Sequence, residues 1–436
     1  MSNLLNSYLK SEIAFSQIEI ILYNLPDNIY LISNWINYAI PLFGSTNFKV
    51  SALELGTMRL PLSPIISQKV NVKKSIKLMR HAIDSGINYF DTDWPYHLGQ
   101  SERIIGKALQ DGYREKVHLV TKLPMFFISR EAEFDFYLNS SLKRLQTDHV
   151  DTYLFHAFSK KTFERMIKLN LLDKMKKARG EGKIGNIEFS FHDTLPVFKE
   201  IVDYFDWNVV QIQYNYMDTV LQVGREGLEY VAAKNMAIVI MEPLKGGQLA
   251  NPPQEAKDVM TASGIDRSPV NWALQYLWDH PEVSCVINGM GDMNMINENC
   301  SSAKHSGIGS LSQNELKVID ELVGISRKSI LVPCTDCKYC MPCPFGVNIL
   351  LHFATLNHQT IERRLYYKFF VRRSYSALVK NKRHLNKSKT NGHASLCTEC
   401  GACIPKCPQG INIPLELKKT LGVLDKRKNV EDVFTL

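Results

Sequence analysis

The stretches INYFDT (87–92), VHLVTKL (117–123) and VDTYLFH (150–156) decide the fold, because each is a short, largely apolar run that ends on polar residues. Segments between the runs, such as VKKSIKLMRHAIDSG (72–86) and SPVNWALQYLWDH (268–280), have the 3.6-residue apolar rhythm of helices. Eight runs alternating with helical segments over about 250 residues predict an α/β protein with a (β/α)8 TIM barrel. A doubly wound sheet is the competitor, but no G-x-G-x-x-G follows the first run. The other five runs are ALELG (52–56), KIGNIEFS (183–190), WNVVQIQYNY (207–216), AIVIME (237–242) and VSCVING (283–289).

Eight of the ten cysteines lie in two arrays near the C-terminus, spaced C-x2-C-x2-C-x2-C-P and C-x2-C-x2-C-x3-C-P. Such spacing can hold cubane iron–sulfur clusters, because three thiolates come from one loop and the fourth from the other array. The first array has two residues before its last cysteine, where the bacterial ferredoxin run has three. Structural zinc is the alternative, since paired Cys-x2-Cys also suits tetrahedral Zn²⁺, but zinc sites rarely use three consecutive x2 spacings. The predicted ligand sets are Cys334, Cys337, Cys340 and Cys407 for one [4Fe-4S] cluster, and Cys343, Cys397, Cys400 and Cys403 for a second.

A chain of 436 residues has room for one large domain and a smaller one. We expect an N-terminal extension over 1–38, the barrel over 39–330, and a ferredoxin-like, mainly helical iron–sulfur domain over 331–436. The capping-box pair Ser312 and Glu315 predicts a helix over 311–328 that leads into the last domain. No run approaches 18 apolar residues, and the N-terminus is a poor signal peptide. Together with thiols kept as metal ligands, this predicts a cytoplasmic protein without a membrane span.

The positive charge of the chain is concentrated at its C-terminal end. Residues 331–436 carry 17 Lys and Arg against 7 Asp and Glu, and the segment 361–391 alone has ten basic residues and one acid. Such a segment could attract an acidic ferredoxin or flavodoxin. Tyr and Phe interleaved with Arg and Lys also resemble a nucleic-acid patch, although nucleic acid is the weaker expectation. A solvated, partly helical connector stays open as the alternative.

Chemistry in TIM barrels collects at the C-terminal ends of the strands. Asp91 ends the second run and Tyr96 follows it, whereas Lys122 and His156 lie at the ends of the next two runs. The stretch INYFDTDWPYHLGQSERIIGKAL (87–109), followed by LVTKL and DTYLFH, resembles the aldo-keto reductases over roughly residues 40–300. With the cysteine arrays, it is similar to a subgroup that has a C-terminal ferredoxin-like domain. The resemblance implies that the four polar residues form the catalytic tetrad of that family.

The chemistry of these residue types fits carbonyl reduction. Hydride transfer to a carbonyl leaves an alkoxide, which needs a proton in the transition state. A tyrosine hydroxyl has an ordinary pKa of about 10, and a nearby ammonium would lower it. We therefore expect Lys122 to lower the pKa of Tyr96, and Asp91 to hold the lysine. His156 is expected to hydrogen-bond the substrate oxygen.

The resemblance also implies contacts to NADP(H) or NAD(H). Met241 stands where many relatives stack a tyrosine on the nicotinamide, and GMGDMNMINEN (289–299) lacks the set that clamps a 2′-phosphate in many NADPH-specific members. Glu54 and Glu188 replace the subgroup's usual glycines, which predicts poorer packing or weaker cofactor binding. The implied cofactor residues are Gly56, Thr57, Met58, Ser190, Gln211, Met241, Leu244, Gly246, Gly247, Gly289, Met290, Glu298 and Asn299.

Three functions are consistent with these features. The leading hypothesis is an oxidoreductase that reduces a small carbonyl substrate with NAD(P)H, Tyr96 being the proton donor and the clusters transferring electrons. In the second hypothesis, the protein is an ordinary carbonyl reductase and its clusters only stabilise the C-terminal end of the chain. The third is a non-catalytic electron-transfer or redox-sensing protein that uses the barrel as a nucleotide-binding platform.

Overall fold

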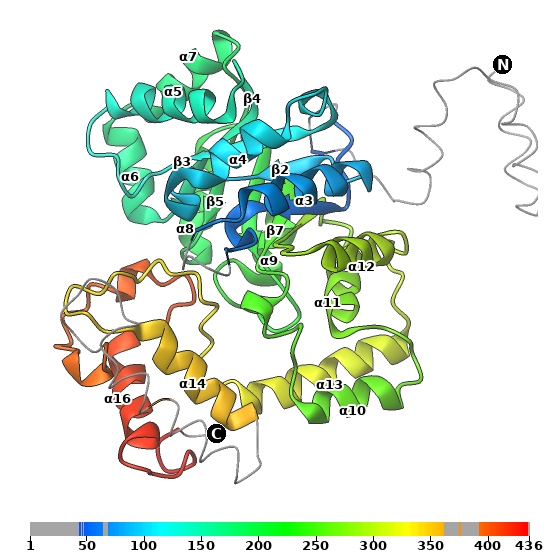
Figure 1. Cartoon of the computed structure of the whole chain (residues 1–436), viewed down its shortest axis with the longest axis vertical. Helices are drawn as coiled ribbons and strands as arrows, with labels where there is room; N and C mark the ends of the chain where they lie inside the picture. The colour runs from blue at the N-terminus through cyan, green and yellow to red at the C-terminus, as the bar shows by residue number, and fades with distance from the viewer. Residues whose placement is uncertain are drawn as a thin grey trace, which may run out of the picture.

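The predicted fold class is confirmed by the computed structural model, in which eight parallel strands close into a barrel and a small, mainly helical unit follows (Figure 1). The predicted extension 1–38 and almost all of the basic segment 361–391 lie outside the described residues. The structure describes residues 43–63 without 45 and 47, residues 69–361, residue 375 and residues 392–434.

Each barrel strand coincides with one of the apolar runs. The strands pair in chain order, and β1 closes the barrel on β8 with Glu54 opposite Ile287. The polar C-terminal ends of all strands therefore meet at one mouth of the barrel. The strands are β1 (Leu53–Gly56), β2 (Tyr89–Asp91), β3 (His118–Leu123), β4 (Val150–Phe158), β5 (Ile184–Phe191), β6 (Val209–Gln213), β7 (Ala237–Met241) and β8 (Cys285–Asn288).

Helices surround the barrel, and some of them begin at a side-chain cap. The Asn71 side chain accepts a hydrogen bond from the Lys74 N–H at the start of α3. The first helices are α3 (Val72–Asp84), α4 (Gln100–Ala108), α5 (Glu133–Leu145), α6 (Lys160–Lys168) and α7 (Leu171–Gly180). They are followed by α8 (Leu195–Tyr204), α9 (Gly224–Ala232), α10 (Gln254–Ala262), α11 (Pro269–Trp278) and α12 (Met293–Ala303).

The stretch before β1 closes the N-terminal end of the barrel. Phe43 and Val50 are fully buried and pack with Tyr89, Val120 and other side chains from the inside of the strands. This plug fills the end opposite the mouth, so a ligand can enter only where the polar residues lie. The two cysteines outside the arrays, Cys285 and Cys300, are both buried.

The C-terminal unit is a helical pair around two cysteine-bearing loops. Helix α13 (Gln313–Ser329) begins at Ser312 with both capping-box bonds, which confirms the predicted helix. It runs from the barrel toward α14 (Ile349–Ile361) and α16 (Ile413–Leu424), which lie together beyond the barrel (Figure 1). A separate apolar core, which includes Val347, Phe353 and Leu417, joins these two helices.

The loops of this unit dock on the barrel mouth. All of the docking bonds described here end on neutral acceptors, mostly backbone carbonyls of the cysteine arrays. These bonds run from Arg59 to the Thr335 carbonyl (3.1 Å), from Gln248 to the Cys334 carbonyl (2.6 Å), from Gln222 to the Pro408 carbonyl (2.5 Å), and both ways between the amides of Gln213 and Gln409 (3.0 and 2.8 Å).

No helix among the described residues is both long and apolar enough to cross a membrane.

Candidate active site

An ion pair at the ends of β2 and β3 forms the base of the site. The Lys122 ammonium donates to one oxygen of Asp91 and, at 3.3 Å, to the Thr92 carbonyl. Both side chains of the pair are almost inaccessible, with exposures of 2% for Lys122 and 3% for Asp91. Burial alone would lower the pKa of Lys122, but Asp91 and Asp93 outweigh it and leave the pKa raised. The lysine therefore stays charged, as expected.

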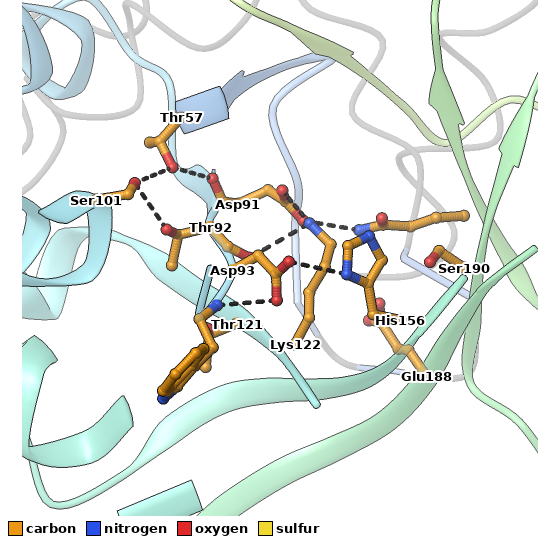
Figure 2. A network of polar contacts seen from close by, with 12 residues as sticks. Thr57, Asp91, Thr92, Asp93, Ser101, Thr121, Lys122, His156, Glu188 and Ser190 are labelled. Carbon is orange, nitrogen blue, oxygen red and sulfur yellow. Dashed lines mark hydrogen bonds and ion pairs between the residues drawn. The ribbon is translucent and has the colours of Figure 1, made fainter. Parts of the chain in front are cut away.

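The second oxygen of Asp91 accepts a hydrogen bond from the Gln211 amide at 3.1 Å. Behind it, the Thr57 hydroxyl donates to the Asp91 carbonyl (2.8 Å) and accepts from Ser101 (2.8 Å). Figure 2 shows this chain of buried hydroxyls, which ties the ends of β1, β2 and α4 together. Asp91 is thus fixed from three sides.

Tyr96 lies in a short 3-10 helix after β2, with the Lys122 nitrogen 5.2 Å from its ring centre. The expected lowering of its pKa is not found. Burial, followed by the negative charges of Asp91 and Asp93, raises the pKa of Tyr96 well above its ordinary value. Sequence reasoning counted the ammonium but not the depth of the site or its two carboxylates. The hydroxyl accordingly keeps its proton in the free protein.

His156 completes the tetrad at the end of β4. Its Nδ1 lies 2.8 Å from a carboxylate oxygen of Asp93, in a contact with almost no solvent exposure (Figure 2). A histidine so placed has a fixed ring orientation, with Nδ1 toward Asp93 and with Nε2 directed into the site. Sequence reasoning missed Asp93, although it stands two residues after Asp91 in the same polar strand end.

A cavity of about 370 Å³ opens above the tetrad. Asp91, Tyr96 and Lys122 line its floor, and ten of the thirteen implied cofactor residues line its walls. An elongated cofactor could thus lie with one end on the tetrad. The ten are Gly56, Met58, Gln211, Met241, Leu244, Gly246, Gly247, Gly289, Glu298 and Asn299.

Three implied cofactor residues do not line this cavity. Thr57 serves the hydroxyl chain described above, and Met290 is 1% exposed within the main core. The Ser190 hydroxyl accepts a hydrogen bond at 2.8 Å from the Ala157 N–H, where β4 departs from regular pairing with β5. These side chains support the cavity walls from behind. The sequence alone does not distinguish such supporting residues from residues that contact the cofactor.

The glycine loop after β7 has a role that sequence reasoning missed. Gly246 has a φ of +67°, and a Cβ added there would lie 2.5 Å from the Thr335 carbonyl oxygen. Only glycine permits both the left-handed backbone and this close approach. The loop was expected to contact a cofactor alone, but it also receives the first cysteine array.

That array inserts a tyrosine between two residues of the tetrad. The Tyr339 hydroxyl lies 3.0 Å from His156 Nε2, and its interaction with Tyr96 opposes the rise in the pKa of Tyr96. Together with Cys337 and Pro408, Tyr339 lines the cavity. Sequence reasoning missed this residue, because the contact joins positions 183 residues apart and depends on how two domains dock.

Two buried acids lie deeper in the barrel, where the subgroup has glycine. Burial, followed by repulsion from Asp91, raises the pKa of Glu54 well above its ordinary value. Burial raises the pKa of Glu188 to about 8, although hydrogen bonding to Thr152 and Tyr89 opposes the shift. Both acids are fully buried, and burial favours the neutral form of each carboxyl group inside the barrel.

The eight array cysteines surround two small cavities rather than one point. No group of three or more His, Cys, Asp or Glu in the described part of the chain is arranged to hold a single metal ion. Spread thiols of this kind fit a multi-iron cluster better than one zinc ion. Cys334, Cys337, Cys340 and Cys407 line one cavity, and Cys340, Cys343, Cys397, Cys400 and Cys403 line the other.

Comparison with known proteins agrees with this geometry. The model of the aldo/keto reductase family matches residues 52–323, and that of a 4Fe-4S dicluster domain matches residues 333–412. The chain belongs to the aldo/keto reductase family. It is therefore an oxidoreductase with a 4Fe-4S domain after its barrel.

Individual relatives of this aldo/keto reductase are distant. It is 28% identical to an uncharacterized oxidoreductase of Bacillus subtilis over 237 residues, which are 47% of the chain and 66% of that protein. It is 27% identical to the NADH-specific methylglyoxal reductase of Escherichia coli, over 48% of the chain and 68% of that protein. The holo form of an aldo-keto reductase from Bacillus halodurans shares the barrel fold with a TM-score of 0.54 and 24% identity, over 64% of the chain and 94% of that structure.

Proposed function

We propose that this aldo/keto reductase reduces a carbonyl substrate with hydride from NAD(P)H, and that Tyr96 donates the proton. The observation that carries the proposal is one cavity with Asp91, Tyr96 and Lys122 at its floor and ten implied cofactor residues in its walls. A bound nicotinamide dinucleotide would supply the hydride, and the Gly246 and Gly289 loops, Gln211 and Asn299 would hold it. Family membership and the NADH-specific relative support the cofactor class.

The chain's own residues have distinct tasks in this reaction. The Tyr96 hydroxyl donates to the carbonyl oxygen and passes its proton on as negative charge develops there. Lys122, 5.2 Å from the ring centre, then stabilises the phenolate, while Asp91 keeps the ammonium in place. Asp93 orients His156 toward the same oxygen. The high pKa of Tyr96 suits a group that must carry a proton until hydride arrives.

The test is the anaerobic oxidation of NADH and NADPH with a panel of aldehydes. Tyr96→Phe should reduce kcat by roughly 100-fold or more, the contribution typical of a general acid. Tyr230→Phe is a matched control, because Tyr230 on α9 bonds Asp203 on α8 and neither residue lines the cavity. Equal rates in wild type and Tyr96→Phe would refute the proposed role.

For the C-terminal domain we propose two [4Fe-4S] clusters held by the crosswise sets, with the first set lining the cavity beside the barrel mouth. Anaerobic protein should contain about eight irons and eight sulfides per chain. Zinc in place of iron would overturn this assignment. Thiols kept as cluster ligands also support a cytoplasmic location.

Electron transfer through these clusters is the first candidate for their role, with an acidic ferredoxin or flavodoxin as partner of the basic segment 361–391. A bracing role is the second, favoured by the bonds that the barrel donates to the Cys334 and Thr335 carbonyls. Cys400→Ser, in the set remote from the tetrad cavity, separates them. Loss of reduction by ferredoxin with carbonyl turnover intact would support the first, and loss of the fold would support the second.

A further inference from the structure

Among the described residues, Tyr339 is the cysteine-array side chain that contacts the catalytic tetrad. It stands between Cys337 and Cys340, two residues of the first predicted ligand set. Its ring packs against Phe126 (centroids 5.8 Å apart) and His192 (6.3 Å), so the side chain is held from the barrel side as well. One part of the pocket wall, formed by Cys337, Tyr339 and Pro408, therefore comes from the 4Fe-4S domain.

The hydroxyl oxygen of Tyr339 lies where a substrate oxygen has to bind. It contacts His156 Nε2 at 3.0 Å, and its interaction with Tyr96 opposes the rise in the pKa of Tyr96. The proposed reaction directs both of these groups at the carbonyl. A carbonyl oxygen that bonds His156 Nε2 would take the place that the Tyr339 hydroxyl occupies, since hydrogen-bonded oxygens lie about 2.7–3.2 Å from the nitrogen. A carbonyl substrate must therefore displace the Tyr339 hydroxyl before it can react.

Displacement leaves the Tyr339 hydroxyl without its partners inside a partly buried pocket. An unpaired buried hydroxyl is costly, so the site discriminates against a substrate that offers it no new bond. A hydroxyl or second carbonyl next to the reacting carbon lies close to the displaced group and can bond to it. A simple alkanal cannot.

We infer that Tyr339 is a specificity-determining residue of the barrel site, and that it selects carbonyl compounds with an adjacent hydroxyl or carbonyl group. This inference rests on the proposed function for its kinetic test, but its binding test is independent. The backbone of the cysteine loop is constrained next to Tyr339. Lys338, directly before it, has a positive φ of 68°, and Asp336 has a positive φ of 56°.

The kinetic test compares glycolaldehyde with propanal, which have the same size and differ by one hydroxyl. Wild type should favour glycolaldehyde in kcat/KM, and Tyr339→Phe should reduce that preference by roughly 2- to 13-fold, the value of one hydrogen bond. The KM for propanal should fall without a loss of kcat. Since aldehyde hydration is the same for both proteins, it cancels in the comparison. Tyr113→Phe is the control, because its hydroxyl bonds Asp84 outside the cavity.

The binding test uses glycolate and propionate, the matching carboxylates, in calorimetry with NADP⁺ present. Tyr339→Phe should bind propionate more tightly and should lose the preference for glycolate. If wild type reduces no aldehyde, the proposed function fails, whereas these titrations still decide the role of Tyr339. Iron content and circular dichroism establish that the variant is folded, and Tyr339→Met serves if the phenylalanine variant is not.

Two results would overturn the inference. An unchanged ratio of kcat/KM values, with unchanged carboxylate affinities, would mean that the hydroxyl does not compete with substrate. A fall of more than tenfold in kcat for both aldehydes would mean that the hydroxyl assists the reaction and is not displaced.

Discussion

Replacement of Gly246 by alanine should loosen the first cysteine array from the barrel. The new Cβ would lie 2.5 Å from the Thr335 carbonyl oxygen and 2.7 Å from its Cα, so this backbone must retreat by roughly 1 Å to reach ordinary contact. That shift removes the Gln248 bond to the Cys334 carbonyl and the Arg59 bond to Thr335. With about 1–2 kcal/mol for each lost bond, the array loses roughly 2–4 kcal/mol of local stability.

Gly182→Ala provides the matched control. Gly182 has a similar φ of +74°, but no atom lies within 4 Å of an added Cβ. Both variants therefore bear a left-handed strain of about 1–2 kcal/mol, and only Gly246→Ala bears the clash. The difference between them isolates the docking of the array.

Hydrogen–deuterium exchange of the amides in 334–341 is the assay. A loss of 2–4 kcal/mol should speed local exchange by roughly 30- to 900-fold in Gly246→Ala, while Gly182→Ala should match wild type in this segment. Equal exchange in the two variants would refute the reasoning, because the close approach of Thr335 to Gly246 would then contribute nothing to the docking of the array.

Three further predictions concern the polar interior. Asp93→Asn should lower kcat by roughly 10- to 100-fold in steady-state kinetics, because His156 loses a charged partner worth about 1.5–3 kcal/mol. Lys122→Met and Asp91→Asn should each reduce the free energy of unfolding by about 3–5 kcal/mol, and the double variant by less than the sum, since no buried charge is left unpaired. Burial raises the pKa of Glu188 to about 8, so its contribution to stability is complete below pH 4.5 and is lost as pH rises to 8. Denaturant midpoints should therefore fall between pH 5 and 9 in wild type, and fall less in Glu188→Gln.

The fold could be predicted because its signals are local. Each apolar run became a strand, and the capping residues of α13 were recognisable at Ser312 and Glu315. The tetrad could be placed because parallel strands bring their C-terminal ends to one mouth, whichever helices intervene. The crosswise cysteine sets stay a prediction from spacing, although the cysteines of each set line one cavity.

What sequence reasoning missed depends on the third dimension. Tyr339 reaches His156 only through the docking of two domains, and Gly246 is constrained by a carbonyl from the other one. The direction of the Tyr96 pKa shift depends on burial, which outweighs a charge that the sequence does reveal. Ser190 has the expected place on its strand but directs its hydroxyl to the Ala157 N–H.

The neutral acceptors at the barrel mouth have a consequence for experiments in salt. Bonds that end on the carbonyls of Cys334, Thr335 and Pro408 and on the Gln409 amide lack the long-range attraction that ions screen. The two domains should therefore stay joined from low to high ionic strength. Any salt dependence of the proposed electron transfer would then report only the encounter with the outside carrier, because the two domains would not separate.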